Sequence, residues 1–186
     1  MVVYSTSKTG DQLNGILELQ RINLSINLSK AEIHEQGFVT VKHSFEELAR
    51  LNEVEQHIIA TDGDKIIAYL LAMTAVSRPD IPVLIPMFDL FDRITFRNKP
   101  VSGYKYIVVG QVCVDINYRG QGILDNCYAA YKDHFNKNYE FAITEIAASN
   151  LRSVNAHKRI GFKEIHRYFD PGGTEWSIVV WDWRDG

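Results

Sequence analysis

Cysteine is scarce in this sequence, and long apolar runs are missing. The two cysteines, Cys113 and Cys127, lie in apolar segments with regular spacing, so we expect buried free thiols, as in a reducing compartment. The longest apolar run, residues 66–76, is too short for a helix to cross a bilayer about 30 Å thick. The first residues lack a charged start followed by a long apolar stretch, so no signal peptide is expected. These absences predict a cytoplasmic protein with no membrane partner.

Positive charge is also limited. The net charge is −3 and Lys and Arg form no run, which argues against a general nucleic-acid surface. A hydrophobic content of 46% is ordinary for a globular chain. A length of 186 residues suits one compact domain, residues 1–186, with a sizeable core. We find no internal repeat, and no metal site is predicted.

The first third of the chain carries two helix-start signals. Thr9 with Gln12, and Ser44 with Glu47, have the spacing of a capping box, and apolar residues at helical spacing follow each pair. Asp62-Gly63 is a strong hairpin signal between two apolar runs. The other short elements expected here are strands over residues 2–4, 57–60 and 65–73, a helical piece over 30–35 and a β-prone run over 37–41.

The pattern changes over residues 75–103, where four prolines forbid a long regular element. Several large apolar side chains, Phe91 among them, alternate with Asp89 and Asp92, so we expect a packed flap rather than disorder. One interpretation is a lid or acceptor-binding loop whose two acids attract an amine. The other is a satellite hydrophobic cluster with two solvated acids.

Strands and helices alternate in the second half. We expect a strand over residues 104–114 with a bulge at Gly110, then a helix to about residue 136 and a strand over 141–148. A strand–helix–strand unit of this length favours a parallel crossover. A helix from Asn150 to Gly161 follows, and an antiparallel pair over 162–168 and 175–183 closes the chain.

Residues 112–124, read as V-C-V-D-I-N-Y-R-G-Q-G-I-L, form the stretch around which the chain is organised. An alternating strand runs into a glycine turn and then into a helix N-terminus, where unpaired N–H groups and the helix dipole favour an anion. Gly120 and Gly122 allow the backbone to approach a phosphate, and Arg119 adds a planar cationic group. The alternative is an ordinary strand-to-helix turn.

This stretch resembles the coenzyme-A signature Q/R-x-x-G-x-G/A of the GNAT superfamily of acyl-CoA-dependent N-acyltransferases. Arg119 takes the first position and Gly122 the first glycine position. Leu124 stands where the family usually has Gly or Ala, although its main-chain N–H remains. The resemblance implies an α/β (α+β) fold with a mixed, mostly antiparallel central sheet, a central parallel strand pair and flanking helices. It also implies that the front third of the chain determines acceptor specificity.

A second segment, residues 150–162, resembles the family's N-x-x-A/S-x-x-x-Y-x-x-x-G-F pattern. Asn150, Ser153, Gly161 and Phe162 match, and His157 stands where the family often has Tyr. Asn150, Ser153 and His157 share one helix face, whereas Asn155 is expected to face elsewhere. The alternative makes these residues a helix cap, a small packing residue and a surface or satisfied histidine.

The two motifs together imply transfer of an acetyl group from acetyl-CoA, as co-substrate, to an amine. The residues expected to bind acetyl-CoA are Cys113, Val114, Arg119, Gly120, Gln121, Gly122, Ile123, Leu124, Asn150, Ser153 and His157. Cys113 and Val114 would act through the backbone, where two neighbouring parallel strands separate in the family.

His157 is the candidate proton donor to the departing thiolate. Glu145 is a candidate base, because a carboxylate is unusual on a strand face shared with apolar residues, and the alternative is a carboxylate paired with a cation. Tyr106, Asp89 and a water chain stay open as the base, and Asp89 and Phe91 are the candidate acceptor-binding residues.

Two other functions compete with an N-acetyltransferase. One is a non-catalytic acyl-CoA-binding or sensing module on the same fold, and the other is an unrelated nucleotide-binding domain. The second lacks support, because neither the G-x-x-x-x-G-K-S/T loop nor a G-x-G-x-x-G turn after a strand is present. The expected partner is a small-molecule or peptide amine, with a homodimer left open.

Overall fold

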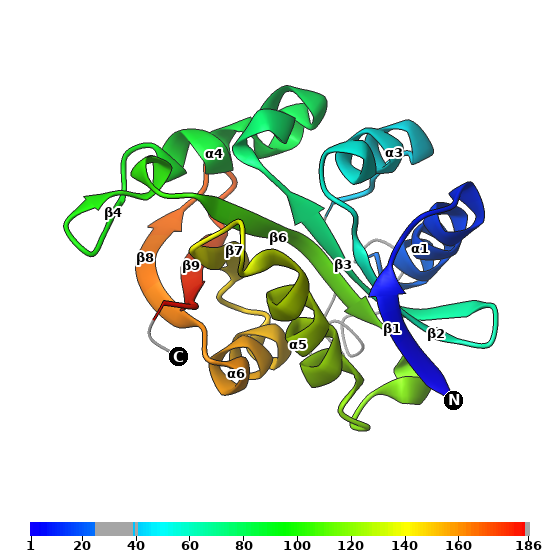
Figure 1. Ribbon diagram of the computed structural model, residues 1–186. Helices are drawn as coiled ribbons and strands as arrows, with labels where there is room; N and C mark the ends of the chain where they lie inside the picture. The colour runs from blue at the N-terminus through cyan, green and yellow to red at the C-terminus, as the bar shows by residue number, and fades with distance from the viewer. Residues whose placement is uncertain (25–38, 40, 185–186) are drawn as a thin grey trace.

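The computed structural model of the protein describes residues 1–24, 39 and 41–184, and it contains a seven-stranded sheet with helices on both faces (Figure 1). The strand order is β1-β2-β3-β6-β7-β9-β8. The strands are β1 (Val2–Thr6), β2 (Ile58–Asp62), β3 (Lys65–Met73), β6 (Tyr106–Val114), β7 (Phe141–Ala147), β8 (Lys163–Phe169) and β9 (Glu175–Asp182). The helices are α1 (Gly10–Asn23), α3 (Phe45–Val54), α4 (Ile85–Phe91), α5 (Ile123–Phe135) and α6 (Leu151–Ile160).

Among the described strands, β6 and β7 form the one parallel pair, and all other neighbours are antiparallel. This arrangement confirms the mixed sheet that the motifs implied. The helical piece expected over residues 30–35 lies outside the described residues. The run expected over 37–41 is described only at Val39, which forms a bridge with Leu24, and at Val41.

Local sequence signals set the helix starts. Both capping boxes form as expected, with the Thr9 hydroxyl accepting from the Gln12 N–H and the Ser44 hydroxyl accepting from the Glu47 N–H. The β2–β3 hairpin also forms, but its turn residues are Gly63 and Asp64, because Asp62 still pairs with Lys65. The turn lies one residue later than the sequence indicated.

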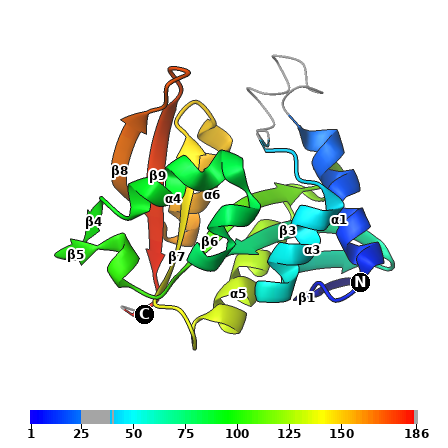
Figure 2. The same cartoon turned by 90° about the horizontal axis from the view of Figure 1, so that it is seen from above.

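Two apolar cores lie on opposite faces of the sheet. The α1/α3 core includes Leu13, Leu48 and Tyr69 and extends to Phe91, the last residue of α4. The α5/α6 core lies between the sheet and those two helices and contains Tyr128. Figure 2 shows α1 and α3 beside the β1–β3 end of the sheet and α4 beside the β8–β9 end. Among the described residues, no helix has both the length and the apolar character that a bilayer crossing needs.

Strand β6 is bulged at Gly110, as expected. Gln111 pairs with Leu71 in β3, whereas Val109 pairs with the next residue, Ala72, so Gly110 is the extra residue. A Cβ at Gly110 would lie 2.2 Å from the terminal methyl group of Met73, so a larger residue would displace that side chain.

The segment over residues 75–103 contains only short pieces, as its prolines indicated. It comprises 3₁₀ turns at Ala75–Asp80, Pro82–Leu84 and Val101–Gly103, helix α4, and a small hairpin of β4 (Thr95–Phe96) and β5 (Lys99–Pro100). Phe88 and Phe91 are buried in the α1/α3 core, and Phe91 meets Tyr106 edge-on at 5.9 Å between ring centroids. The segment is therefore packed on the sheet.

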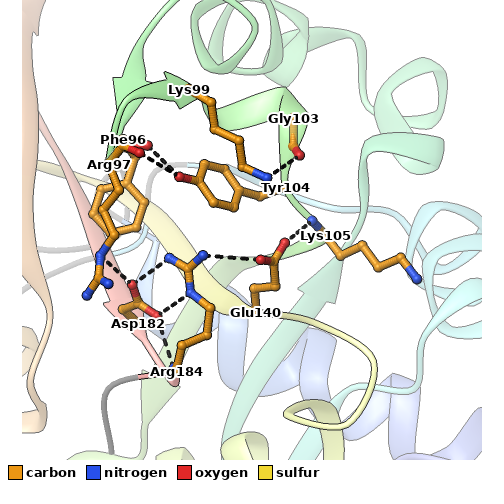
Figure 3. A network of polar contacts seen from close by, with 9 residues as sticks. All are labelled: Phe96, Arg97, Lys99, Gly103, Tyr104, Lys105, Glu140, Asp182 and Arg184. Atoms are coloured by element: carbon orange, nitrogen blue, oxygen red, sulfur yellow. Dashed lines mark hydrogen bonds and ion pairs between the residues drawn. The ribbon is translucent and has the colours of Figure 1, made fainter.

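A charged cluster joins the β4–β5 hairpin to the end of β9 (Figure 3). Asp182 lies 3.0 Å from Arg97 and 2.7 Å from Arg184, and Arg184 also pairs with Glu140 at 3.1 Å. The Tyr104 ring lies against the Lys99 ammonium at 3.7 Å and the Arg184 guanidinium at 4.9 Å. Burial opposes the charge on Asp182, yet the Arg184 hydrogen bonds and both arginine charges keep the pKa of this carboxyl below its usual value.

We expect Asp182→Asn to lower the free energy of unfolding by about 1–2 kcal/mol at pH 7, because one carboxylate neutralises two arginines and is 11% exposed. A carboxyl with a lowered folded-state pKa stabilises the fold above its unfolded pKa and loses that effect as pH falls. The difference from the unmodified protein should therefore shrink below about pH 4. Urea denaturation at pH 7 and pH 3.5 measures it. Asp80→Asn, which breaks a single exposed pair with Arg50, is the control and should cost less.

Candidate functional site

The two motifs meet at one cavity of about 650 Å³ at the carboxyl end of β6. From the first motif, the lining includes Cys113, Val114, Arg119, Gly120, Gly122, Ile123 and Leu124. From the second motif it includes Asn150, Ser153 and His157. Gln121 is not among the lining residues, and its side-chain amide donates to the Asn117 carbonyl at 2.9 Å. The structure thus places ten of the eleven expected acetyl-CoA-binding residues around the same space.

The cavity exists because β6 and β7 separate. Their parallel pairing ends at Val108 and Ile143, although β6 continues to Val114 and β7 to Ala147. The lining residues Val112 and Val114 pack on the α5/α6 side of the sheet, whereas Cys113 belongs to the α1/α3 core. Asn23 and Val39 also line the cavity from the α1/α3 side. The space therefore reaches both faces of the sheet through the gap between the strands.

Backbone groups of β6 that no described strand pairs with face this gap. The Asp115 N–H donates to the Ile67 carbonyl in β3 at 2.8 Å, and successive residues of a strand present their N–H groups to opposite edges. The N–H groups of Val112 and Val114 consequently point towards β7, while that of Cys113 points towards β3. The Val114 carbonyl confirms this alternation, because it accepts a hydrogen bond from Arg119 Nε at 2.9 Å.

The turn before α5 exposes main-chain donors. Gly120 and Gly122 have φ of +76° and +75°, a conformation that favours glycine, and Gly122 is the N-cap of α5. Within the described part of the chain no side chain caps α5, whereas Thr9, Ser44 and Asn150 cap α1, α3 and α6. The first N–H groups of α5 therefore have no partner within the helix, and the helix dipole favours an anion at this end.

Arg119 bends back over the cavity. Its Nε bonds the Val114 carbonyl, and one terminal nitrogen bonds Asn23 Oδ1 at 2.7 Å. Burial, together with the nearby charge of Arg152, lowers the pKa of Arg119 from its usual value. Arg152 and Arg159 also line the cavity but were not singled out from the sequence. Both lie about half a turn around α6 from Asn150, so the spacing of the motif gave no signal for them.

Helix α6 positions the second motif. Asn150 Oδ1 accepts from the Ser153 N–H at 3.2 Å, so Asn150 does cap the helix, and it lines the cavity as well. Asn155, expected to face elsewhere, also lines the cavity, which is wider than one helix face. Asn150 is therefore both the cap of α6 and part of the cavity wall.

His157 is 2% exposed, and its imidazole is hydrogen-bonded at both nitrogens. Its Nδ1 lies 2.8 Å from the Ser153 carbonyl, which only accepts, so Nδ1 carries the proton and Nε2 accepts from the Tyr128 hydroxyl. Burial lowers the pKa of His157 to about 4. The ring is therefore neutral at pH 7, and its single N–H proton is donated to Ser153.

Glu145 lies on β7, two residues beyond the last pair with β6. Its Oε2 accepts a hydrogen bond from the Tyr168 hydroxyl at 2.7 Å, and burial raises the pKa of this carboxyl above its usual value. No cation pairs with it among the described residues, so the alternative of an ion pair is not what the structure shows. Glu145 is not among the residues that line the cavity.

Asp89 and Phe91 lie away from this cavity. Asp89 faces Arg78 at 3.5 Å, and Phe91 is fully buried. Their role in acceptor binding stays a prediction. In the described part of the chain, no group of three His, Cys, Asp or Glu side chains is arranged to hold a metal ion.

We expect the stability of the protein to fall as pH drops from 6.5 towards 4, because the folded protein cannot protonate His157 and the unfolded chain can. In His157→Gln, the decrease in unfolding free energy between pH 7 and pH 5 should be smaller by about 1–2 kcal/mol. Denaturant titrations at both pH values measure this. If ¹⁵N NMR showed that the His157 ring gains its second proton near pH 6.5, the lowered pKa of His157 would be wrong.

Comparison with known proteins gives a family and a fold. A sequence profile of the acetyltransferase (GNAT) family matches residues 22–162. No curated protein sequence matches the chain. Many solved structures match the fold of the chain, and three are given as examples.

The NatC complex bound to Gag peptide and CoA has a chain with TM-score 0.65 at 15% identity, covering 97% of this chain and 98% of that one. The ribosomal-protein-S18-alanine N-acetyltransferase from Escherichia coli has TM-score 0.60 at 16% identity, with 97% and 92% covered. Arabidopsis thaliana Naa50 in complex with the bisubstrate analogue CoA-Ac-MVNAL has TM-score 0.62 at 12% identity, with 98% and 99% covered.

At these identities the neighbours establish the fold alone, and the family follows from the profile, which covers well over half of the chain. The separated parallel strands, the uncapped glycine turn and the profile agree, and this chain belongs to the GNAT acetyltransferase family.

Proposed function

We propose that the protein transfers an acetyl group from acetyl-CoA to an amine. The observation that carries this proposal is the cavity at the β6–β7 gap, which joins both motifs and reaches both faces of the sheet. Two reactants need such a passage, because the acyl donor and the amine must meet at one carbon from different sides. The family profile supports the same reaction class.

The residues around the cavity fit acetyl-CoA. The uncapped N-terminus of α5 and the two glycines offer main-chain donors to a pyrophosphate, and Arg119 and Arg152 add positive charge. The Val112 and Val114 N–H groups suit the amides of an extended pantetheine arm. We place the donor on the α5/α6 side, with its sulfur end directed towards the gap.

The amine would then enter from the α1/α3 side, where Asn23, Val39 and Cys113 line the cavity. Its nitrogen attacks the thioester carbonyl carbon, the C–S bond breaks, and the thiolate takes up a proton. The carbonyl oxygen gains negative charge in this step, and a β6 N–H facing the gap can stabilise it. A protein or peptide amine fits the class of neighbours, and a small-molecule amine remains compatible with the family.

Two side chains are proposed for proton transfer. Glu145 is the candidate base, because it follows the strand separation and carries a raised pKa without a cation beside it. His157 is the candidate acid at the other side of the gap. Its neutral ring holds one proton on the Ser153 carbonyl, so it would have to gain a second proton before it could pass one to sulfur.

Binding is tested first. We expect Gly122→Val to weaken acetyl-CoA binding by tenfold or more, because the side chain disfavours the positive φ that presents the α5 N–H groups. Gly173→Val is the matched control, since Gly173 has φ of +83° with open space around it in the β8–β9 turn. Isothermal calorimetry measures both. Equal weakening in the two variants, or no uptake by the unmodified protein, would refute the donor site.

Transfer is tested next with a panel of amines that includes peptide N-termini, amino acids and polyamines, read by thiol release. Release that depends on one amine class supports the transferase. Acetyl-CoA binding with no release across the panel would instead support the non-catalytic acyl-CoA-binding module.

With an accepted amine, we expect Glu145→Gln to lower the turnover number by about 10²-fold or more. The base must be ionised to act, so activity of the unmodified protein should rise with pH through the raised pKa, and the variant should lose this rise. The same assay on His157→Ala tests the acid. Unchanged turnover at saturating substrates would remove the catalytic role of the residue concerned.

A further inference from the structure

A buried hydrogen-bond network links α1, β3 and β6 under the α1/α3 side of the cavity. Gln111 Oε1 accepts from Gln20 Nε2 at 3.0 Å and from the Tyr69 hydroxyl at 2.6 Å. Gln111 Nε2 donates to the Val41 carbonyl at 2.7 Å, and Gln20 Oε1 accepts from the His43 N–H at 2.9 Å. All four side chains, Gln20, His43, Tyr69 and Gln111, are at least 92% buried. None of them was singled out from the sequence.

The network holds one particular segment, which we name the strap and define as Val39 and residues 41–43. Two of its bonds, to the Val41 carbonyl and the His43 N–H, end on strap backbone. The Val39 N–H donates to the Asn23 carbonyl at 3.1 Å at the end of α1. The strap therefore has no ladder of its own in the described residues and depends on Gln111, Gln20 and Asn23 for its position.

The placement of the strap matters for the cavity. Val39 and Asn23 line the cavity on the α1/α3 side, and Arg119 bonds Asn23 Oδ1. Gln111 follows the Gly110 bulge directly, next to the point where β6 leaves β7. Gln111 thus connects the strand that borders the gap with the strap, of which Val39 lines the opposite wall.

Stability alone does not account for two glutamines at these positions. Buried amides contribute little net stability when apolar residues of similar volume can replace them, but they fix geometry when every polar atom has a partner. The His43 ring is buried beside the network, and among the described residues neither nitrogen has a hydrogen-bond partner, although the Glu47 carboxylate lies 3.9 Å from Nδ1. Burying the strap therefore also carries a desolvation cost. The directional bonds of Gln111 and Gln20 are the interactions that hold it there.

We infer that Gln111, with Gln20, is a positioning residue that holds the strap as the fixed acceptor-side wall of the cavity. This inference rests on the proposed function, in which the amine enters from the α1/α3 side. It predicts separate effects on the two substrates, since the donor-binding turn and α6 do not contact the strap through this network. The wall would set how tightly the amine binds, whereas acetyl-CoA binding would not depend on it.

The test compares Gln111→Met and Gln20→Met with Tyr69→Phe. Tyr69→Phe is the matched control, because it removes one buried hydrogen bond from the same network and leaves both strap bonds in place. Amide hydrogen exchange of His43 and calorimetry with acetyl-CoA are measured for all three, and neither needs an amine. The KM of an amine accepted in the panel is the third readout.

We expect His43 exchange to accelerate about tenfold in both glutamine variants and less than twofold in Tyr69→Phe, with the acetyl-CoA Kd within twofold throughout. The amine KM should rise at least tenfold in the glutamine variants only. Equal exchange in all three variants, or parallel loss of acetyl-CoA binding, would overturn the inference and indicate general loosening of the fold. Failure of the unmodified protein to bind acetyl-CoA would show separately that the proposed function is wrong.

Discussion

The structure depends on the point where β6 and β7 stop pairing. Two parallel strands that separate leave backbone groups without partners, which is costly unless other groups satisfy them. Here the Thr144 hydroxyl donates to the Val109 carbonyl at 2.7 Å, and the Tyr131 hydroxyl donates to the Val108 carbonyl at 3.1 Å. These two bonds satisfy backbone carbonyls of β6 where its pairing with β7 ends, and the Gly110 bulge changes the direction of β6 immediately afterwards. The gap beyond them is therefore a stable feature of the fold.

The two faces of the sheet present different chemical groups around this gap. On the α5/α6 side, a glycine turn and an uncapped helix present main-chain donors, a surface suited to an anionic donor molecule. On the α1/α3 side, glutamine side chains and the last turn of α1 hold the strap. Arg119 touches both sides, because its guanidinium bonds the Val114 carbonyl in β6 and Asn23 in α1. Arg119 thus connects the donor-binding turn with the end of α1, and these bonds do not include Gln111 or Gln20.

Polar groups near the site are held by burial as much as by partners. His157 is neutral because its ring is enclosed and both nitrogens are bonded, and Glu145 binds its proton more tightly because it is enclosed without a cation. The raised pKa of Glu145 suits a base, whereas the lowered pKa of His157 does not favour an acid, and packing alone produces both shifts. The chemistry proposed for these two residues therefore rests on their position beside the gap as well as on their ionisation.

Residue spacing along the chain was enough to predict the local elements and the two motifs. Capping boxes, the Gly110 bulge, the glycine turn and the helix from Asn150 depend on neighbouring residues, so spacing alone reveals them. The predicted hairpin turn was wrong by one residue, and Asn155 was expected to face away from the cavity that it lines. Turn register and cavity width could not be predicted, because both depend on the elements packed against them. In contrast, the network of Gln20, Tyr69 and Gln111, which lie up to 91 residues apart, is visible only in the folded protein. No periodicity encodes that contact, since it arises when the sheet brings α1, β3 and β6 together and excludes water from between them.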